Sequence, residues 1–236
     1  MPLAMKNDGG KRRHAAAQRD PDTKYGAKRP SCCAFAPRMP ADTAIRGVRM
    51  LQIKKVPLFG TRARCVKQLY QEAFPVEQRV PFWSLRLRSG MNGMELSAYY
   101  DEDVFCGFVN LVASDDAVYV YYLAVDAERR GKGYGAMILD DLRRRYAGKT
   151  IALDIEATDP AADNPRQRAA RRAFYLDNGF VSSGYGFKDG GLFEVLVCGE
   201  KLAGPGAYAS LIDRLAFGLT STVVRPMKEI KHPRKR

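Results

Sequence analysis

The sequence predicts an α+β fold, an α/β/α sandwich in which helices cover both faces of a mixed, mostly antiparallel sheet of six to seven strands. Three observations support this prediction. Segments with period-two alternation recur between residues 52 and 198, segments with helical periodicity separate several of them, and closely spaced strand pairs indicate hairpins. Strand–helix alternation beside hairpins is typical of a mixed sheet between two helical layers.

In the first half of the domain, cap and turn residues separate the periodic segments. Thr61 can cap a helix whose apolar residues recur at helical spacing, and Pro75 ends that helix. Pro81 suits the first turn of a short second helix. The expected strands of this half are 52–56, a hairpin of 95–100 and 104–112, and a strand that ends at Val125.

In the second half, a glycine-rich turn precedes an amphipathic helix that places Tyr134, Ile138 and Leu142 on one face. Gly179 is the expected left-handed residue after the next helix. The other expected elements are an alternating strand at 150–157, a helix at 167–178, strands at 181–187 and 191–198, and an amphipathic helix at 207–219.

The glycine-rich turn is the strongest indication of function. Gly131, Gly133 and Gly135 allow the backbone to approach a ligand closely, with several N–H groups pointing the same way. The helix that follows adds partial positive charge at its N-terminus, and Arg130 and Lys132 add full charges. The turn is therefore expected to bind a phosphate-bearing cofactor.

Two common phosphate motifs do not fit. The P-loop needs four residues between its glycines, followed by Gly-Lys-Ser/Thr, and this pattern is absent. The dinucleotide fingerprint is also missing, because the third glycine comes one residue early, although Asp154 and Glu156 lie roughly the expected ~20 residues downstream. Five residues, 126–130, separate the strand from the first glycine, whereas a Rossmann turn follows its strand directly.

The spacing Arg130-x-x-Gly133-x-Gly135 instead resembles the acetyl-coenzyme A signature of the GNAT N-acetyltransferases. The strand 118–125 lies just before it, as in that family. Residues 172–180 resemble the family's second motif, a helix that ends in Phe-Tyr-x-x-x-Gly-Phe. The resemblance covers roughly residues 52–200.

This resemblance implies a GNAT-like sheet, acetyl-CoA as a cosubstrate and no metal. In the family, the strand before the turn splays from its neighbour, and its backbone groups bind the pantetheine arm and polarise the acetyl carbonyl. The corresponding strand residues are Leu123, Ala124 and Val125. The residues expected to take the pyrophosphate are Arg130, Gly131, Lys132, Gly133, Tyr134, Gly135 and Ala136.

The resemblance also indicates catalytic residues. Tyr175 matches the family's usual general acid, because a phenol with a pKa near ~10 can protonate a thiolate at neutral pH. Ordinary aromatic packing is the alternative. Glu156 is the candidate general base, with Asp154 on the same strand face and Glu77 as a third choice. The alternative for the strand carboxylates is solvation or substrate orientation.

One position departs from the family pattern. An asparagine that contacts the pantetheine often precedes the tyrosine by seven residues, and here Arg168 occupies that position, with Asn164 nearby. Arg168 could reach a phosphate instead. Arg166, Arg171 and Arg172 add a basic helix face, which is interpreted as solvated, with an acidic substrate as the alternative.

Composition excludes several function classes. The two histidines, His14 and His232, lie in the predicted tails, which excludes Ser-His-Asp and Cys-His catalysis and histidine-rich metal sites. Five cysteines without a C-x-x-C pair argue against a disulfide framework. No apolar stretch approaches a membrane span or a signal peptide, so a cytoplasmic protein without a membrane partner is expected.

The net charge of +13 lies largely in the tails. Residues 1–49 carry 11 Lys+Arg and 4 Asp+Glu, and are expected to form a disordered basic extension. A start at Met50 or a nucleic-acid-binding arm are the two explanations of this segment. Residues 50–203 form the expected acetyltransferase domain, and 204–236 an amphipathic helix and basic tail. This helix can dock on its own domain or form a dimer contact, so a monomer or a homodimer is expected.

The predicted function is acetyl transfer from acetyl-CoA to a primary amine by direct attack in a ternary complex. The acceptor is a small-molecule or peptide amine, which in this family is selected by segments that correspond here to residues 61–92 and 157–166. The alternatives are transfer from another acyl-CoA, a non-catalytic acyl-CoA-binding protein, and a basic nucleic-acid-binding protein on the same fold. Nucleic acid is not the expected partner, since solvated tails explain the charge.

Overall fold

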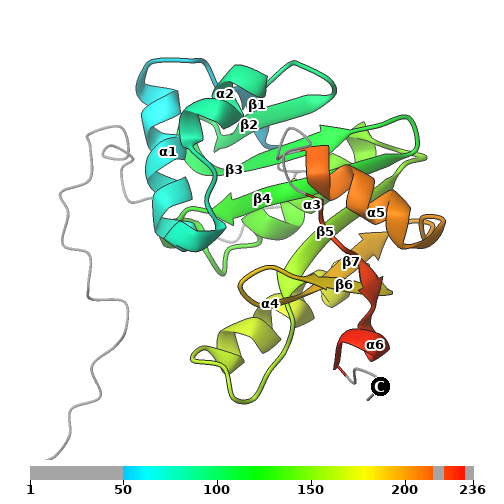
Figure 1. Ribbon diagram of the computed structural model, residues 1–236. Coiled ribbons are helices and arrows are strands. Elements are labelled where there is room, and N and C mark those ends of the chain that lie inside the picture. Colours follow the sequence, from blue (N-terminus) through cyan, green and yellow to red (C-terminus); the bar gives the residue numbers. More distant parts are fainter. Residues whose placement is uncertain (1–49, 215–220, 232–236) are drawn as a thin grey trace, which may run out of the picture.

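The computed structural model describes residues 50–214 and 221–231 (Figure 1). The predicted basic extension at 1–49 and the final residues of the predicted helix 207–219 lie outside the described residues. One sheet of eight strands, in the order β1-β2-β3-β4-β5-β7-β6-β8, organises the domain. The strands are β1 (Gln52–Lys55), β2 (Met94–Asp101), β3 (Val104–Ala113), β4 (Ala117–Val125), β5 (Thr150–Glu156), β6 (Val181–Lys188), β7 (Leu192–Cys198) and β8 (Arg225–Pro226).

The sheet is mixed and mostly antiparallel, as predicted. Only β4 and β5 pair in parallel among the described strands, and α3 provides the crossover between them. The eighth strand was not predicted, because β8 contains two residues and pairs with β6 through Tyr185 and Gly186 alone. So short a strand carries no period in the sequence.

Helices cover both faces of the sheet, which confirms the sandwich. They are α1 (Thr61–Ala73), α2 (Phe82–Arg88), α3 (Tyr134–Arg145), α4 (Pro165–Asp177), α5 (Gly204–Asp213) and α6 (Met227–Lys231), with short 3₁₀ turns η3 (Val76–Gln78) and η4 (Ala127–Arg129). The helices α1 and α2 pack on one face of β2–β4, and α5 packs on the same face further along the sheet. The helices α3 and α4 pack on the opposite face.

The alternation of β4 shows how the sequence produces these two layers. Val118 and Val120 lie in the core with α3, whereas Ala117 and Tyr119 lie in the core with α5. The predicted face of β5, with Ile151, Leu153 and Ile155, is likewise buried with α3 and α4. Burial of alternate side chains on opposite faces is what a strand between two helical layers requires.

The ends of several helices differ from the sequence predictions. Gly60, not Thr61, is the N-cap of α1. Because glycine has no side chain, the first turn of this helix has no side-chain cap. Pro81 is the N-cap of α2 rather than its first residue. The helix α5 begins at Gly204, three residues before the predicted start, and docks on its own sheet through buried Tyr208 and Leu211.

Candidate active site

The candidate site lies where β4 and β5 separate. The parallel register runs from Ala117↔Thr150 to Val120↔Leu153 and then stops, although β4 continues to Val125 and β5 to Glu156. A β-bulge in β4 coincides with this point, because Asn110 pairs with Tyr122 while its neighbour Leu111 pairs with Val120. Such a bulge bends its strand and increases the local twist. The two strands therefore open into a splay, as the resemblance implies.

The backbone of β4 offers hydrogen-bonding groups to this splay. The Asp126 N–H donates to the Cys106 carbonyl of β3 at 2.8 Å. Since successive residues of a strand direct their backbone groups to opposite sides, Ala124 also faces β3, and Leu123 and Val125 face the splay. The Val125 carbonyl fits this pattern, because it accepts from the Arg130 Nε at 3.2 Å. Of the three predicted strand residues, two thus have backbone groups directed toward a ligand in the splay.

The glycine-rich turn leads from η4 directly into α3. Gly131 and Gly133 are left-handed, with φ of 71° and 83°, and Gly133 is the N-cap of α3. A Cβ at either glycine would have no neighbour within 4 Å, so the space in front of the turn is open. The first turn of α3 contains no acidic residue and no side-chain cap. Its amides, including those of Gly135 and Ala136, are available to an anion.

Gly135 has a different role from the other two glycines of the turn. A Cβ at this position would lie 2.9 Å from the ring of Phe174 in α4. Glycine at this position allows α3 and α4 to approach closely. Gly135 of the glycine-rich motif therefore contacts Phe174 of the second motif. The packing of Phe174 therefore links the turn to the helix that carries Tyr175.

Tyr175 is buried in the core under α3 and α4, against Phe174 and Phe180. Burial raises the pKa of its phenol to about 12, the Arg171 charge lowers it, and the Asp154 carboxylate raises it. The phenol therefore stays protonated at neutral pH. Among the described residues, no group forms a hydrogen bond with its hydroxyl.

Asp154 of β5 interacts with tyrosines from β4 and α4 near the point where β4 and β5 separate. Its Oδ1 accepts from the Tyr119 hydroxyl at 2.6 Å. Burial raises the pKa of this carboxyl to about 6, and the hydrogen bond from Tyr119 opposes that shift. The same carboxylate contributes to the raised pKa values of Tyr122 and Tyr175, so it lies close to tyrosines from both β4 and α4.

Glu156 occupies a different environment from Asp154. Its two carboxylate oxygens accept from Arg168 at 2.9 Å and from Arg171 at 3.1 Å. Both oxygens of this carboxylate are therefore held by arginines of α4, which ties that helix to the end of β5. Glu77, the third predicted carboxylate, is an exposed residue of the turn η3.

The arginines of α4 are held by protein groups. Besides Glu156, Arg168 binds Asn164 and the Ala157 carbonyl. Its guanidinium is therefore held by protein groups and is not directed to a phosphate, which was the alternative considered above for this position. Arg172 donates to Glu194 at 3.0 Å. The basic face of α4 is thus partly neutralised by carboxylates of β5 and β7, and it is not a simple solvated face.

The described residues contain neither a candidate metal site nor a candidate membrane-spanning helix. Within residues 50–214 and 221–231, no group of three or more His, Cys, Asp and Glu side chains is placed to hold a metal ion. None of the helices in that part of the chain combines the length and the apolar character that crossing a membrane requires.

Comparison with known proteins shows which proteins share the sheet, the splay and the glycine-rich turn. Residues 94–182 match the family model described as the acetyltransferase (GNAT) domain. That match extends from the start of β2 into β6 and includes the splay, the turn and Tyr175. Over these residues the chain is therefore similar to the GNAT acetyltransferase domain. Among curated proteins, no sequence matches this chain.

Solved structures agree with this assignment at the level of the fold. A GNAT-family acetyltransferase structure from Bacteroides thetaiotaomicron is 21% identical, covers 72% of this chain and 99% of its own, and has a TM-score of 0.58. An aminoglycoside 6′-N-acetyltransferase complexed with coenzyme A is 16% identical, covers 65% of this chain and 99% of its own, and has a TM-score of 0.52. At these identities the likeness shows the fold alone.

Sequence reasoning gave Asp154 only a secondary place. The period-two pattern of β5 predicts both carboxylates on one strand face, but no pattern indicates which of them the arginines of α4 reach. Tyr119 was read only as part of a strand. Its hydrogen bond to Asp154 depends on the parallel register of β4 and β5, which the sequence does not encode locally.

Proposed function

We propose that this protein transfers the acetyl group of acetyl-CoA to a primary amine by direct attack in a ternary complex. The splay supports the proposal, because β4 and β5 separate close to a carboxylate, Asp154, that raises the pKa of the protonated phenol of Tyr175. Holding two reactants in one such opening replaces a bimolecular encounter with an oriented reaction.

The turn of Gly131 and Gly133 and the first amides of α3 would hold the diphosphate of the cosubstrate, with Arg130 and Lys132 adding charge. The absence of any atom within 4 Å of a Cβ at either glycine supports the approach of a ligand there. When bound, acetyl-CoA supplies an activated thioester carbonyl. The N–H groups of Leu123 and Val125 would bind the pantetheine arm and polarise that carbonyl.

Asp154 is proposed to accept a proton from the substrate ammonium, which makes the nitrogen lone pair available. A carboxyl with a pKa of about 6 is ionised at neutral pH yet more basic than an ordinary aspartate. Glu156 is the alternative base, but its two arginine partners favour a positioning role that fixes α4 against β5.

Tyr175 is proposed to protonate the sulfur as the new C–N bond forms and the C–S bond breaks. Its pKa of about 12 keeps it protonated until a thiolate develops next to it. The net result is one acetyl group moved from sulfur to nitrogen and one proton moved from nitrogen to sulfur, with the enzyme groups restored through solvent.

A thiol-release assay with acetyl-CoA and a panel of amines tests this proposal. We expect release that depends on an added amine and an N-acetylated product visible by mass spectrometry. Release that is the same without any amine would indicate a thioester hydrolase and would reject the proposal. Substituting a longer acyl-CoA in the same assay distinguishes acetyl transfer from transfer of other acyl groups.

A further inference from the structure

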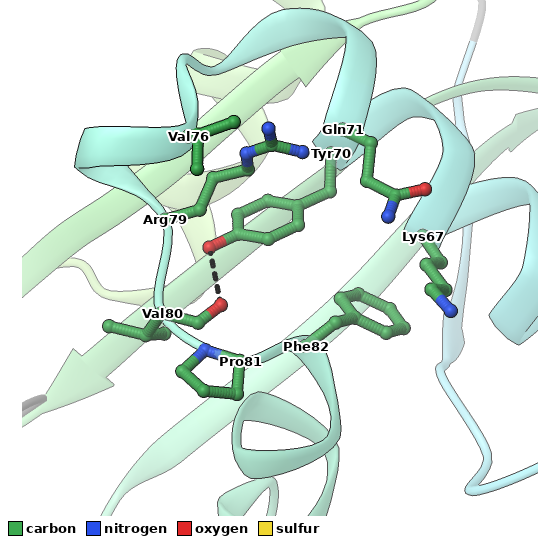
Figure 2. A pocket seen from close by; sticks show the side chains of 8 residues that line it. All are labelled: Lys67, Tyr70, Gln71, Val76, Arg79, Val80, Pro81 and Phe82. Atoms are coloured by element: carbon green, nitrogen blue, oxygen red, sulfur yellow. Dashed lines mark hydrogen bonds between the residues drawn. The ribbon is translucent and has the colours of Figure 1, made fainter.

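A pocket lies between α1 and the segment that connects α1 to α2. It has a volume of about 370 Å³ and is bordered by one face of α1 and by residues 76–82 (Figure 2). We call residues 76–82 the strap. The lining residues are Lys67, Tyr70, Gln71, Val76, Arg79, Val80, Pro81 and Phe82.

The polar part of this pocket is cationic. Lys67 and Arg79 contribute two positive charges, Gln71 adds an amide, and none of the lining residues is acidic. Among the residues that the structure describes, no carboxylate forms an ion pair with Lys67 or Arg79. The Arg79 Nε is buried and has no hydrogen-bond partner there. A buried donor of this kind is costly unless a ligand satisfies it.

The apolar part is formed by aromatic and aliphatic groups. Figure 2 shows the ring of Tyr70 at the centre of the pocket, with Arg79 on one side of it and Phe82 on another. The Tyr70 hydroxyl donates to the Val80 carbonyl at 3.0 Å, which fixes the strap across the helix. The pocket therefore suits a group that combines a negative charge with an apolar chain.

The arginines on the other side of the site contrast with those of the pocket. In α4, Arg168 and Arg171 are both paired with Glu156, and Arg172 is paired with Glu194. Their charge is already compensated within the protein. The charge of Lys67 and Arg79 is not compensated by a described carboxylate, so an anionic ligand would gain more at the strap than at α4.

The strap is hydrogen-bonded to β4, one of the two strands that form the splay. The Tyr122 hydroxyl of β4 donates to the Gln78 carbonyl at 2.8 Å, and the rings of Tyr70 and Tyr122 meet edge to face, with centroids 4.9 Å apart. Tyr122 in turn lies close enough to Asp154 for that carboxylate to affect its pKa. The pocket is thus one aromatic ring away from the strand that lines the splay.

The glycine-rich turn and the pocket lie on opposite faces of the sheet. The turn leads into α3, on one face, whereas α1 and the strap cover the other face. Resting on the function proposed above, we propose that the pocket binds an anionic group of the amine acceptor. The acceptor class is then an amine that also carries a carboxylate or a phosphate, separated from the amine by an apolar spacer.

Matched pairs of amines test this inference. Each pair contains an ω-amino carboxylic acid and its carboxamide, or an aminoalkyl phosphate and its amino alcohol, assayed by thiol release with acetyl-CoA at several spacer lengths. We expect kcat/KM to favour the anionic member by roughly tenfold or more, since charge-assisted hydrogen bonds are lost with the neutral member. Comparing the carboxylate and phosphate pairs shows which anion the pocket accepts.

Variants connect this preference to the pocket. Lys67→Gln and Arg79→Gln should each reduce the preference by roughly tenfold, through the KM for the anionic amine rather than through kcat. Arg64→Gln is the matched control, because Arg64 is an exposed arginine of the same helix that does not line the pocket. Thermal unfolding checks that each variant is folded, and Lys67, an exposed helix residue, provides a test if Arg79→Gln is destabilised.

The possible failures are distinguishable. Transfer to neutral and anionic amines with equal efficiency, or a preference that both pocket variants retain, would reject the pocket assignment and leave the acetyltransferase function standing. Absence of transfer to every amine would reject the proposed function, and the acceptor assignment with it.

Discussion

Tyr119 donates a hydrogen bond of 2.6 Å to Asp154 across the parallel pair of β4 and β5, just before the two strands separate. This bond stabilises the ionised carboxylate, whereas burial of Asp154 disfavours it. The balance of the two effects leaves the pKa of the carboxyl at about 6. A base that is ionised at neutral pH and still readily protonated follows from this balance.

The first prediction concerns the acidic limb of the pH–rate profile. Because Asp154 must be ionised to accept a proton, kcat/KM should rise with pH and level off above a pKa of about 6. Asp154→Asn should lower kcat/KM by about 10²-fold and abolish that limb. Tyr119→Phe removes the bond that lowers the pKa, so the limb should move to higher pH. A limb that stays in place in both variants would show that another group is titrating.

Stability provides an independent check on the same carboxyl. Its folded-state pKa lies above the usual value, so the contribution of Asp154 to stability is fully present below about pH 4 and is lost as pH rises through about 6. Asp154→Asn should therefore gain stability relative to the unsubstituted protein as the pH rises from 4 to 7. Chemical denaturation at several pH values measures this difference without any assay of activity.

The second prediction separates Glu156 from Asp154. Glu156→Gln breaks the ion pairs with Arg168 and Arg171, leaving two partly buried cations without their partner. The free energy of unfolding should fall by about 1–3 kcal/mol, while the acidic limb of the pH–rate profile stays in place. Displacement of the limb in Glu156→Gln, with no displacement in Tyr119→Phe, would make Glu156 the base instead.

The third prediction concerns Tyr175. Removing its hydroxyl should lower kcat by about 10²-fold in Tyr175→Phe, because the leaving sulfur loses its proton donor. The Kd for acetyl-CoA should hardly change, since the ring and its packing against Phe174 and Phe180 remain. Binding is measured by calorimetry and turnover by thiol release. Unchanged turnover would leave Tyr175 with a packing role only.

The fourth prediction concerns the contact between the two motifs. Gly135→Ala places a methyl group 2.9 Å from the ring of Phe174, and the overpacking should cost about 1–3 kcal/mol of stability. Phe174→Leu removes the obstructing ring, so the double variant should be more stable than the sum of the single effects predicts. Strict additivity in this double-mutant cycle would show that the two residues do not constrain each other.

Much of the fold could be predicted from the sequence because its signals are local. The alternation of Ile151, Leu153 and Ile155, the left-handed Gly179 and the glycine-rich turn before α3 each depend on a few neighbouring residues, and each is confirmed. The strand β8 was missed because two residues have no period. The N-cap of α1 was misassigned because a glycine cap leaves no side-chain signature.

The site was harder to predict, since its chemistry arises from contacts between distant segments. The backbone roles proposed for Leu123 and Val125 follow from the bulge at Tyr121, which needs the β3 register to be seen. Likewise, the choice between Asp154 and Glu156 depends on which carboxylate two arginines of α4 reach, and the strap pocket depends on how residues 76–82 cross α1. Neither arrangement can be predicted from the residues of a single segment.

Calorimetry tests whether the turn of Gly131 and Gly133 binds acetyl-CoA. The protein should bind acetyl-CoA with one site per chain, and Gly133→Val should weaken binding by roughly tenfold or more, because a β-branched residue resists a φ of 83°. Gly148→Val, at a left-handed glycine after α3 with φ of 85°, is the matched control and should retain the affinity. Absence of heat on adding acetyl-CoA, or tighter binding of a nicotinamide dinucleotide or a nucleoside triphosphate, would contradict the assignment of the turn.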